Sequence, residues 1–459
     1  MENSSSFFCN KACKYFPCHK VEDTDTFNCL FCYCPLYMLG DRCGGNFRYT
    51  KRGIKDCTLC TIPHRPDSAE YIRTRFAEIA ANAGIAPTAP QPELFSEPDD
   101  QKDPYAVIAA WNEAIAPQDE EAARASKAHW DSVAKPLDGL GKLETIVTRI
   151  AALTGKENVN IEKRAVAVLC ADNGVVEEGV TQTDASVTAT MARNVASHRS
   201  SVCLMAKSAR ADVYSIDIGI LHRVDGTIDL HVGDGTANMT KGPAMTAEQA
   251  IKALKNGVAL AKSFADRGYR ILVTGEMGIG NTTTSSAIAS VLLDLPVKTV
   301  TGRGAGLSDE GLERKRTAIK KAIEINKPDP SDAFDVLQKL GGFDLAGLAG
   351  LYIGAALCRM PILIDGLPSS VAALVASRLV PNCTIAMLPS HCSAEPVAQA
   401  ILKELGLEAI IFANMKLGEG TGAVCMLPLI DEALAVYHGS VRFNATGIEQ
   451  YQPLGGTTE

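Results

Sequence analysis

The chain has 459 residues, enough for two or three domains, and its 46% hydrophobic and 21% charged residues are ordinary for a globular protein. The net charge of −8, from 45 basic and 53 acidic residues, does not indicate nucleic acid as the main partner. No apolar run approaches the length of a membrane span and residues 1–6 lack the pattern of a secretion signal, so we expect a cytoplasmic protein.

Cysteine is concentrated near the start of the chain, where nine of the fifteen cysteines lie between Cys9 and Cys60. In a cytoplasmic protein such a cluster is typical of a metal site rather than of a disulfide framework, and the six scattered cysteines are expected to be buried thiols. The pairs Cys29–Cys32 and Cys57–Cys60 have the spacing that lets two thiolates face one ion. The ligands suffice for two zinc ions, zinc is favoured over an iron–sulfur cluster, and the spacing leaves the grouping of the thiols open. The predicted metal ligands are Cys9, Cys13, Cys18, His19, Cys29, Cys32, Cys34, Cys43, Cys57, Cys60 and His64.

The cysteine cluster marks a separate module, predicted over residues 1–83. It has too few apolar residues to stay folded without a metal staple. The run 29–37, with Cys18 and His19 before it and residues 57–64 after it, resembles a cysteine-rich small domain. That domain occurs beside proteins of the cobalamin pathway and is regarded as metal-binding, and the resemblance implies no defined activity.

A linker and a larger domain are predicted after this module. Residues 84–103 are rich in Pro, Asp, Glu and Gln and are predicted to be a linker that follows a helix at about 68–81. From 104 to 459, apolar runs alternate with amphipathic helical patterns, which predicts a parallel sheet covered on both faces, a Rossmann-like α/β domain. Helical segments at both ends of this region predict a smaller helical domain. The predicted strands are 164–170, 211–217, 270–274, 361–365, 383–388 and 409–413.

The segment 270–286 is the clearest candidate for a ligand site. A short apolar strand is followed by Gly275-Glu276-Met277-Gly278-Ile279-Gly280 and then by polar residues that begin a helix. Such a turn lets the backbone approach a ligand, and a helix N-terminus offers N–H groups that suit a phosphate. The segment is neither a Walker loop nor a full dinucleotide fingerprint, because no Gly-Lys-Ser/Thr follows and Thr283 stands in place of the third glycine.

Three other glycine-rich segments, 172–183, 301–307 and 416–423, follow predicted strands or lead into helices. Glycines flank Glu419, so its carboxylate can project into a cleft, where a partly apolar pocket would raise its pKa and make it a general base. The alternative is an ordinary Glu near a helix N-terminus. Two glycine-flanked acids and the basic turn 314–316 together indicate a small phosphorylated substrate.

Four motifs in the right order make this domain resemble the nicotinate-nucleotide–dimethylbenzimidazole phosphoribosyltransferase family. The motifs are 235–238, 275–283, 302–306 and 417–422, and the resemblance spans about residues 104–434. The family transfers ribose 5-phosphate from nicotinate mononucleotide to 5,6-dimethylbenzimidazole or a related base, giving the α-riboside phosphate and nicotinate for the lower ligand of cobalamin. The resemblance implies a homodimer and a reaction without a metal or other cofactor, because the pyridinium leaving group departs neutral.

The resemblance also implies roles for single residues. Glu419 matches the base that accepts the ring N–H proton of the benzimidazole, and Glu276 matches a second acidic position in the active site. The loop 172–183 matches the lining of the benzimidazole pocket, while 278–283, 302–306 and Lys315 match the phosphate-binding region. The substrate-binding residues that follow are Asp172, Asn173, Gly174, Thr181, Thr183, Gly278, Gly280, Asn281, Thr282, Thr283, Gly302, Arg303, Gly304, Lys315, Gly418 and Gly420.

Other functions are weighed against this one. A transferase of the same fold could act on a different aromatic base. A phosphoribosyl-pyrophosphate-dependent transferase usually needs adjacent acids and magnesium, and Ile364-Asp365-Gly366 offers a single acid. A nicotinamide-dinucleotide oxidoreductase is disfavoured by the broken fingerprint and by the lack of an obvious hydride-site histidine. A metal-sensing or trafficking protein that only binds its ligand would be distinguished from an enzyme by a turnover assay.

Overall fold

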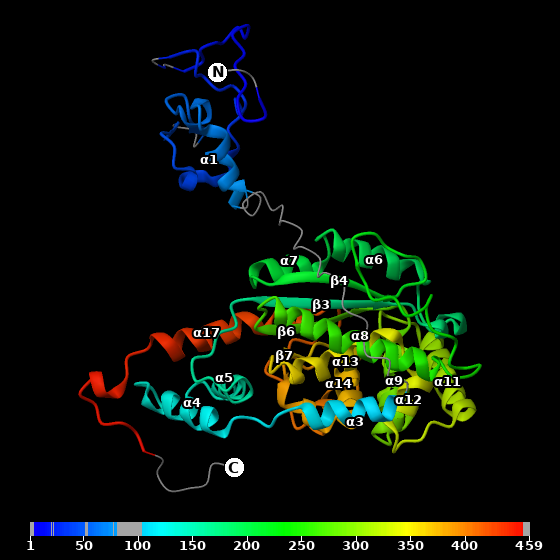
Figure 1. Ribbon diagram of the computed structural model, residues 1–459. Helices are drawn as coiled ribbons and strands as arrows, with labels where there is room; N and C mark the ends of the chain where they lie inside the picture. Colours follow the sequence, from blue (N-terminus) through cyan, green and yellow to red (C-terminus); the bar gives the residue numbers. More distant parts are fainter. Residues whose placement is uncertain are drawn as a thin grey trace. The chain divides into compact units, whose positions relative to one another are not determined.

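The computed structural model describes residues 4–19, 21, 23–50, 54–76, 78–79 and 103–452. The chain divides into two compact units, Met1–Gln91 and Pro92–Glu459, and each is described by itself (Figure 1). The predicted linker, 84–103, lies outside the described residues except for Asp103, whose side chain caps α3 (Pro104–Ala114).

The first unit is made of short elements around a small apolar cluster. These elements are the 3₁₀ helix η1 (Pro35–Cys43), the antiparallel strands β1 (Arg48–Tyr49) and β2 (Lys55–Asp56), the 3₁₀ helix η2 (Ile62–His64) and α1 (Ser68–Thr74). Leu36, Leu39 and Ile72 pack in this cluster together with the Cys43 and Cys60 side chains. So small a core leaves much of the stability to other interactions. Of the helix expected over 68–81, the structure shows α1 up to Thr74, and the rest of that range is only partly described.

A six-stranded parallel sheet with the order β5-β4-β3-β6-β7-β8 forms the centre of the second unit. Its strands are β3 (Arg164–Ala171), β4 (Asp212–Gly219), β5 (Ile228–Asp229), β6 (Ile271–Met277), β7 (Ile362–Leu363) and β8 (Met387–Leu388). The chain moves outward from β3 through β4 to β5 and then returns to the other side of β3 with β6. This reversal leaves a crevice outside the carboxyl ends of β3 and β6, where ligands of such sheets bind. The predicted Rossmann-like α/β fold is confirmed.

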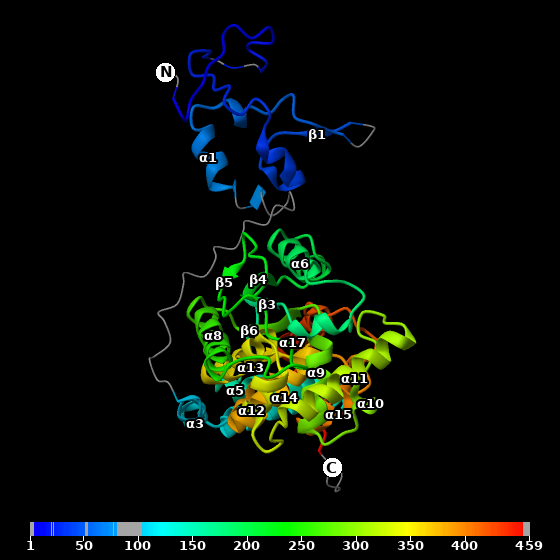
Figure 2. The same ribbon diagram turned by 90° about the vertical axis from the view of Figure 1, so that its right-hand side faces the viewer.

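Helices cover both faces of the sheet, as Figure 2 shows for α6 (Ser186–Ala196) and α8 (Ala247–Asp266). On one face Val166, Val168 and Cys170 of β3 join a core cluster with residues of α5 (Lys142–Thr154), α6, α7 (Ser201–Ser208) and α17 (Met426–Gly439). On the other face α13 (Phe343–Leu357) packs against β3 and β4, and α8 packs against α13. No helix in the described part of the chain is long and apolar enough to span a membrane.

The smaller helical part is gathered from both ends of the second unit, as predicted. It combines α4 (Glu120–Ser132) and α5 with α17 from the end of the chain (Figure 1). The His129 ring stacks on Tyr437 with ring centroids 3.9 Å apart, and His129 Nε2 lies 2.7 Å from the Tyr437 carbonyl oxygen.

Three of the strand predictions differ from the structure. The strand expected at 361–365 shrinks to β7, and that at 383–388 is mostly the 3₁₀ helix η4 (Pro381–Ala386), because proline at the first position favours a helical turn. Residues 409–413 form no strand and only Ile411 makes a bridge, to His391, before the chain turns at Asn414 with φ 52°. The two-residue strand β5 was not predicted, because it is too short to show a pattern.

Glycines let α8 and α13 approach each other until their backbones touch. A methyl group at Gly350 of α13 would overlap the carbonyl oxygen of Leu254 in α8, and one at Gly257 of α8 would overlap the carbonyl oxygen of Gly347. Because neither obstacle is a movable side chain, any larger residue must push the helices apart.

We therefore expect Gly350→Ala to lower the free energy of unfolding by about 1–3 kcal/mol, the usual cost of overpacking a core. Urea unfolding followed by circular dichroism measures this loss. Gly242→Ala is the matched control, because a methyl group there meets nothing within 4 Å. Equal midpoints for the two variants would contradict the described packing.

Candidate active site

A cavity of about 280 Å³ lies outside the carboxyl end of β6, next to the point where the strand order reverses. Seven separate stretches of the chain line it, and they include most of the predicted catalytic and substrate-binding residues. The predicted residues in the lining are Thr181, Thr183, Glu276, Gly278, Gly280, Asn281, Thr282, Arg303, Gly304, Lys315, Gly418 and Glu419. The fold thus brings together parts of the four glycine-rich segments 172–183, 270–286, 301–307 and 416–423, which are far apart in the sequence.

Glu276 is the sixth residue of β6 and is only 8% exposed. The Asn281 side-chain amide, at the start of α9 (Asn281–Leu292), donates hydrogen bonds to Glu276 Oε2 and to Asp344 Oδ2, the latter at 3.1 Å. Burial raises the pKa of Glu276 to about 8; the bond from Asn281 opposes this shift, and the charges of Asp344, Asp365 and Glu419 add to it. Glu276 is therefore mostly protonated at neutral pH and can donate a hydrogen bond into the cavity.

Glu419 has a backbone conformation that residues other than glycine rarely adopt. Its φ is 59°, between Gly418 at 86° and Gly420 at 92°, so three consecutive residues are left-handed. The loop rests directly on β6, where a methyl group at Gly275 would lie 2.5 Å from the Glu419 carbonyl oxygen. The glycines are thus needed for both the turn and the close approach.

Asp365, which follows β7, fixes the loop from the other side. Its Oδ2 accepts a hydrogen bond from the Gly420 N–H at 3.1 Å, and its Oδ1 accepts one from the Ala423 N–H at 2.9 Å. These two bonds satisfy free N–H groups at the start of α16 (Thr421–Val424). The position of the Glu419 backbone is therefore set by contacts from two strands.

The Glu419 carboxylate is 5% exposed, and its Oε2 has no hydrogen-bond partner among the described residues. Burial raises the pKa of Glu419. A hydrogen bond from the Val202 N–H opposes this shift, and the negative charge of Asp365 adds to it. A buried carboxylate with a free oxygen and a raised pKa is suited to accept a proton from a ligand.

The part of the cavity around Lys315 has the character of an anion site. Lys315 of α11 (Asp309–Asn326) is 1% exposed, and its Nζ donates a hydrogen bond to Thr282 Oγ1 at 2.8 Å. Burial lowers the pKa of Lys315 to about 8, with the charge of Glu395 acting against this shift. The helix α9 begins at Asn281 beside this lysine, so the positive end of a helix and an ammonium group line the same cavity.

The remaining predicted substrate-binding residues do not line the cavity: Asp172, Asn173, Gly174, Thr283, Gly302 and Gly420. Asp172 Oδ2 accepts a hydrogen bond from the Leu221 N–H at 2.8 Å, and a methyl group at Gly174 would overlap the Thr236 carbonyl oxygen. Asp172 and Gly174 therefore contact the neighbouring loops around Leu221 and Thr236.

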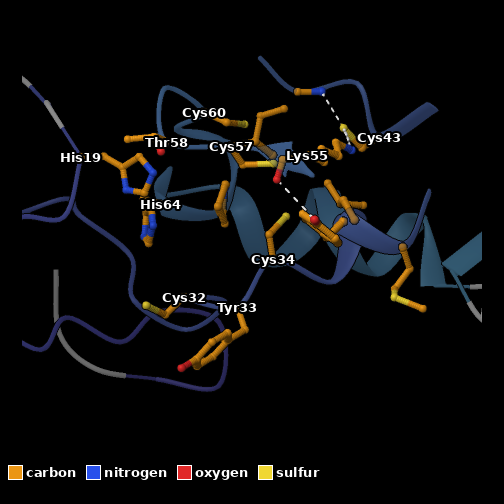
Figure 3. A pocket seen from close by; sticks show the side chains of 16 residues that line it. His19, Cys32, Tyr33, Cys34, Cys43, Lys55, Cys57, Thr58, Cys60 and His64 are labelled. Carbon is orange, nitrogen blue, oxygen red and sulfur yellow. Dashed lines mark hydrogen bonds between the residues drawn. The ribbon is translucent and has the colours of Figure 1, made fainter. Parts of the chain in front are cut away.

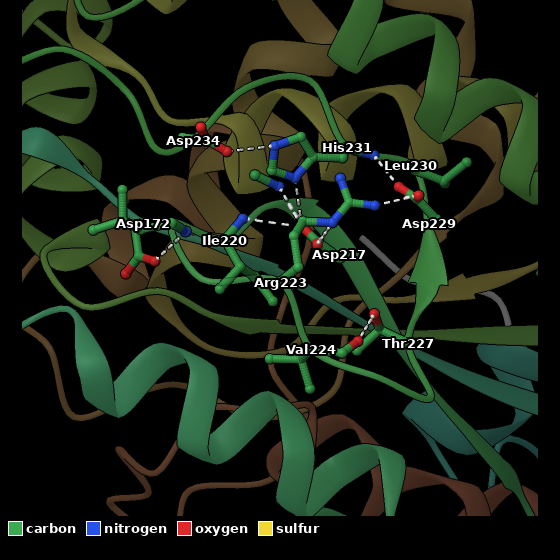
Figure 4. A network of polar contacts seen from close by, with 12 residues as sticks. Asp172, Asp217, Ile220, Arg223, Val224, Thr227, Asp229, Leu230, His231 and Asp234 are labelled. Carbon is green, nitrogen blue, oxygen red and sulfur yellow. Dashed lines mark hydrogen bonds and ion pairs between the residues drawn. The ribbon is translucent and has the colours of Figure 1, made fainter.

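A polar network holds those loops in place (Figure 4). Asp217, near the end of β4, accepts hydrogen bonds from the Gly219 and Ile220 N–H groups, both at 3.0 Å. The same carboxylate lies 3.1 Å from His231 Nδ1 and 3.2 Å from Arg223 Nε. It thus ties the loop after β4 to the segment after β5.

Several residues at the site were not predicted. Asp344 lies in the first turn of α13, where an acidic residue is common and gives no signal of a site. Its burial raises its pKa to about 6. Asp365 was noted only as a lone acid. His391, Ser393, Glu395 and Lys416 also line the cavity. His391 closely follows the predicted strand 383–388, and this position after a strand could have indicated it.

The first unit contains a group of possible metal ligands. Cys18, His19 and His64 have ligand atoms that all lie within 4.8 Å of one another, and within the described ranges they are the one such group of three or more. Cys18 Sγ is 3.7 Å from His64 Nε2 and 3.3 Å from His19 Nδ1. His64 Nδ1 lies 2.8 Å from the Asn28 carbonyl oxygen, which leaves Nε2 to face an ion. This donor set fits a structural zinc ion.

Other cysteines of this unit line a cavity of about 570 Å³ that also reaches the two histidines (Figure 3). In Figure 3, His19 and His64 lie together at one end and Cys43 lies at the other, with Cys34 and Cys57 between them. None of the fifteen cysteines, all of which lie in the described part of the chain, forms a disulfide.

Both units of the chain match known protein families. A family model described as "Phosphoribosyltransferase" matches residues 115–448, and one described as "Cysteine-rich small domain" matches residues 4–84. A nicotinate-nucleotide–dimethylbenzimidazole phosphoribosyltransferase of Acetivibrio thermocellus is 46% identical over 325 residues, which cover 70% of this chain and 93% of that protein. One from Escherichia coli is 39% identical over 323 residues, covering 70% and 90%. The crystal structure of CobT from Thermus thermophilus matches with a TM-score of 0.69 and 35% identity, covering 72% of this chain and all of that one. The chain therefore belongs to the nicotinate-nucleotide–dimethylbenzimidazole phosphoribosyltransferase family.

Proposed function

We propose that the chain transfers ribose 5-phosphate from nicotinate mononucleotide to 5,6-dimethylbenzimidazole or a related base, giving α-ribazole 5′-phosphate (or the corresponding α-riboside phosphate) and nicotinate. The observation that carries this proposal is the arrangement of one cavity. Two buried carboxyl groups, Glu276 and Glu419, line it together with the buried ammonium group of Lys315 and the N-terminus of α9. A phosphate at one side and a proton acceptor at the other are what this transfer needs.

The chemistry divides between the two glutamates. A ring nitrogen of the base forms a bond to C1′ of the ribose while the bond from C1′ to the nicotinate nitrogen breaks. The electron pair of the broken bond neutralises the pyridinium, so the leaving group needs no metal ion. The N–H proton of the attacking base moves to Glu419, whose free Oε2 is available to accept it. Glu276 carries its own proton at neutral pH and serves as a hydrogen-bond donor that orients a substrate.

The 5′-phosphate binds beside Lys315 and the start of α9. The Thr282 hydroxyl and the Lys315 ammonium group are its ligands in this proposal, and the positive end of α9 adds to the attraction. The glycine-rich loop of Gly302 and Gly304 covers them, since a methyl group at Gly304 would lie 2.9 Å from Thr282 Oγ1. The resemblance to the family also implies a homodimer, which would sediment at twice the mass of the chain.

The deciding experiment is a turnover assay without added metal. The purified chain is incubated with nicotinate mononucleotide and dimethylbenzimidazole in the presence of EDTA, and nicotinate release is followed by chromatography. Stoichiometric release of nicotinate and formation of the riboside phosphate support the proposal. A requirement for magnesium and phosphoribosyl pyrophosphate, or binding without turnover, would instead support one of the rival functions.

The first unit contributes structure rather than chemistry in this proposal. We infer that Cys18, His19 and His64 take part in binding zinc, which holds the module folded because its apolar core is small. Fifteen cysteines without a disulfide among the described residues suit a reducing compartment such as the cytoplasm.

Deletion of residues 1–100 is accordingly expected to leave turnover close to that of the full-length chain, since the transfer uses no metal and the cavity residues all lie in the second unit. Steady-state rates of the two proteins measure this. Chelator should alter the circular dichroism of the full-length chain but not that of the truncated one. A truncated protein that folds but has lost turnover would show that the module takes part in the active site.

A further inference from the structure

The cysteine side chains of the first unit include two spatially separate groups. Four of them, Cys34, Cys43, Cys57 and Cys60, line the cavity of about 570 Å³ and belong to one apolar cluster with Leu36, Leu39 and Ile62. Cys34 precedes η1, Cys43 ends it, and the other two flank the turn after β2. Each of these sulfur atoms is therefore placed by a short, defined element.

The backbone at Gly45 brings two of the four sulfurs together. A methyl group at this position would lie 2.8 Å from Cys60 Sγ and 3.6 Å from Cys43 Sγ, so both sulfurs lie close to the same point beside the Gly45 backbone. The Gly45 N–H also donates to Cys43 Sγ at 3.4 Å. The Cys60 N–H bonds to the Cys57 carbonyl oxygen at 2.9 Å, which closes the turn of the Cys-x2-Cys pair.

Backbone donors surround one of these sulfurs at the start of η1. The N–H groups of Leu36 and Tyr37 are directed at the Cys34 sulfur. Donors directed at a sulfur stabilise its charged form. Such bonds around a metal-bound group are the outer contacts that orient the ligands.

Lys55 adds a buried positive charge at the same place. It is 7% exposed, and its Nζ lies 3.0 Å from Cys43 Sγ and 4.2 Å from the Phe47 ring centroid. A buried ammonium group is stable only beside a negative partner. A divalent ion held by four thiolates has a net negative charge, which Lys55 would offset.

The other group is separate. Cys18 Sγ lies 3.3 Å from His19 Nδ1 and 3.7 Å from His64 Nε2. The two histidines of this group lie at the opposite end of the cavity from Cys43 (Figure 3).

We propose that Cys34, Cys43, Cys57 and Cys60 form a second metal centre, a tetrathiolate zinc site with Lys55 as its outer cation, distinct from the centre of Cys18, His19 and His64. The proposal rests on zinc binding by the first unit and not on the transferase reaction. Zinc–sulfur bonds of about 2.3 Å would draw the four sulfurs inward from the walls of the cavity into one tetrahedron.

Metal content of full-length variants tests this grouping. The unaltered chain should hold about two zinc ions, as four-coordinate structural sites require. Cys60→Ser and Cys18→Ser should each hold about one, and the double variant none. Cys358→Ser in the second unit is the control and should hold about two. Loss of both ions in either single variant, or a content unchanged by Cys60→Ser, would overturn the proposal, as would iron with inorganic sulfide in the purified protein.

Cobalt(II) distinguishes the two centres by their ligands. In the Cys18→Ser chain the remaining ion should show the strong sulfur-to-cobalt absorption of four thiolates, whereas in the Cys60→Ser chain this absorption should be weaker per ion. Equal absorption in the two chains would contradict the assignment. Lys55→Met should weaken cobalt binding about 10–100-fold at the tetrathiolate centre alone, as expected for an outer contact. The matched control is the exposed Lys11, as Lys11→Met.

A measurement on the unaltered chain covers the case in which a variant fails to fold. Alkylation of the zinc-loaded protein during stepwise chelation, read by mass spectrometry, should release Cys34, Cys43, Cys57 and Cys60 together and separately from Cys18. Release of all thiols in one step would overturn the proposal. Nicotinate release by the same samples reports on the transferase independently, so its failure and that of the zinc grouping cannot be confused.

Discussion

Glu419→Gln is expected to lower turnover about 10²–10⁴-fold while nicotinate mononucleotide still binds, the usual cost of removing a general base. Glutamine keeps the shape of the side chain but cannot take the proton from the benzimidazole. The Glu419 backbone is fixed by Gly275 and Asp365, so the substitution should change the chemistry and leave the loop in place. Initial rates of nicotinate release and calorimetric titration with nicotinate mononucleotide give the two quantities.

Two comparisons make this experiment specific. Glu408→Gln changes a glutamate whose side chain is 77% exposed, and its turnover should match that of the unaltered chain. Glu276→Gln should cost less than Glu419→Gln at neutral pH, because glutamine resembles the protonated form that a pKa of about 8 implies. Near-normal turnover of Glu419→Gln with a large loss in Glu276→Gln would transfer the role of base to Glu276.

The second large effect is expected at Lys315. Lys315→Met should raise the KM for nicotinate mononucleotide about 10–100-fold, because a hydrogen bond to a charged group contributes about 1.5–3 kcal/mol. The effect on turnover should be smaller, since the phosphate does not take part in the bond changes. Lys320→Met, on the exposed face of the same helix, is the matched control.

This lysine should also give the reaction a recognisable dependence on pH. Its pKa of about 8 means that the ammonium form is present below pH 8 in the free protein and is lost as the pH rises through that value. The KM for nicotinate mononucleotide should therefore rise above pH 8 in the unaltered chain. In Lys315→Met that rise should be absent, and its persistence would show that another group controls it.

Long, regular elements could be predicted from the sequence, and contacts between distant segments could not. The apolar runs of β3, β4 and β6 showed the parallel sheet, because each is long enough to be read as a buried strand. Residues 409–413 have the same composition but form no strand, since a single bridge to His391 is all that the sheet edge provides. Composition alone does not distinguish these two situations.

At the cavity, too, local features could be predicted from the sequence, whereas contacts between distant residues could not. Glu276 and Glu419 could be singled out because glycines next to an acid are a local signal, and the structure places both at one cavity. Asp344 is 68 positions from Glu276 in the sequence, and only the bridging amide of Asn281 shows that the two acids share a donor. The grouping of the thiols was likewise open, because ligand sets are defined by folding and not by spacing.

The three consecutive left-handed residues around Glu419 have a consequence for engineering this protein toward other bases. Saturation libraries at Gly418, Gly420 and Gly275 should return almost only glycine. Gly418 and Gly420 have positive φ angles that other residues rarely adopt, and a side chain at Gly275 would overlap the backbone of Glu419. The carboxylate that we propose as the catalytic base therefore has to be kept in any engineered variant. Useful diversity has to come from residues 180–183, which line the same cavity from a loop that carries ordinary side chains.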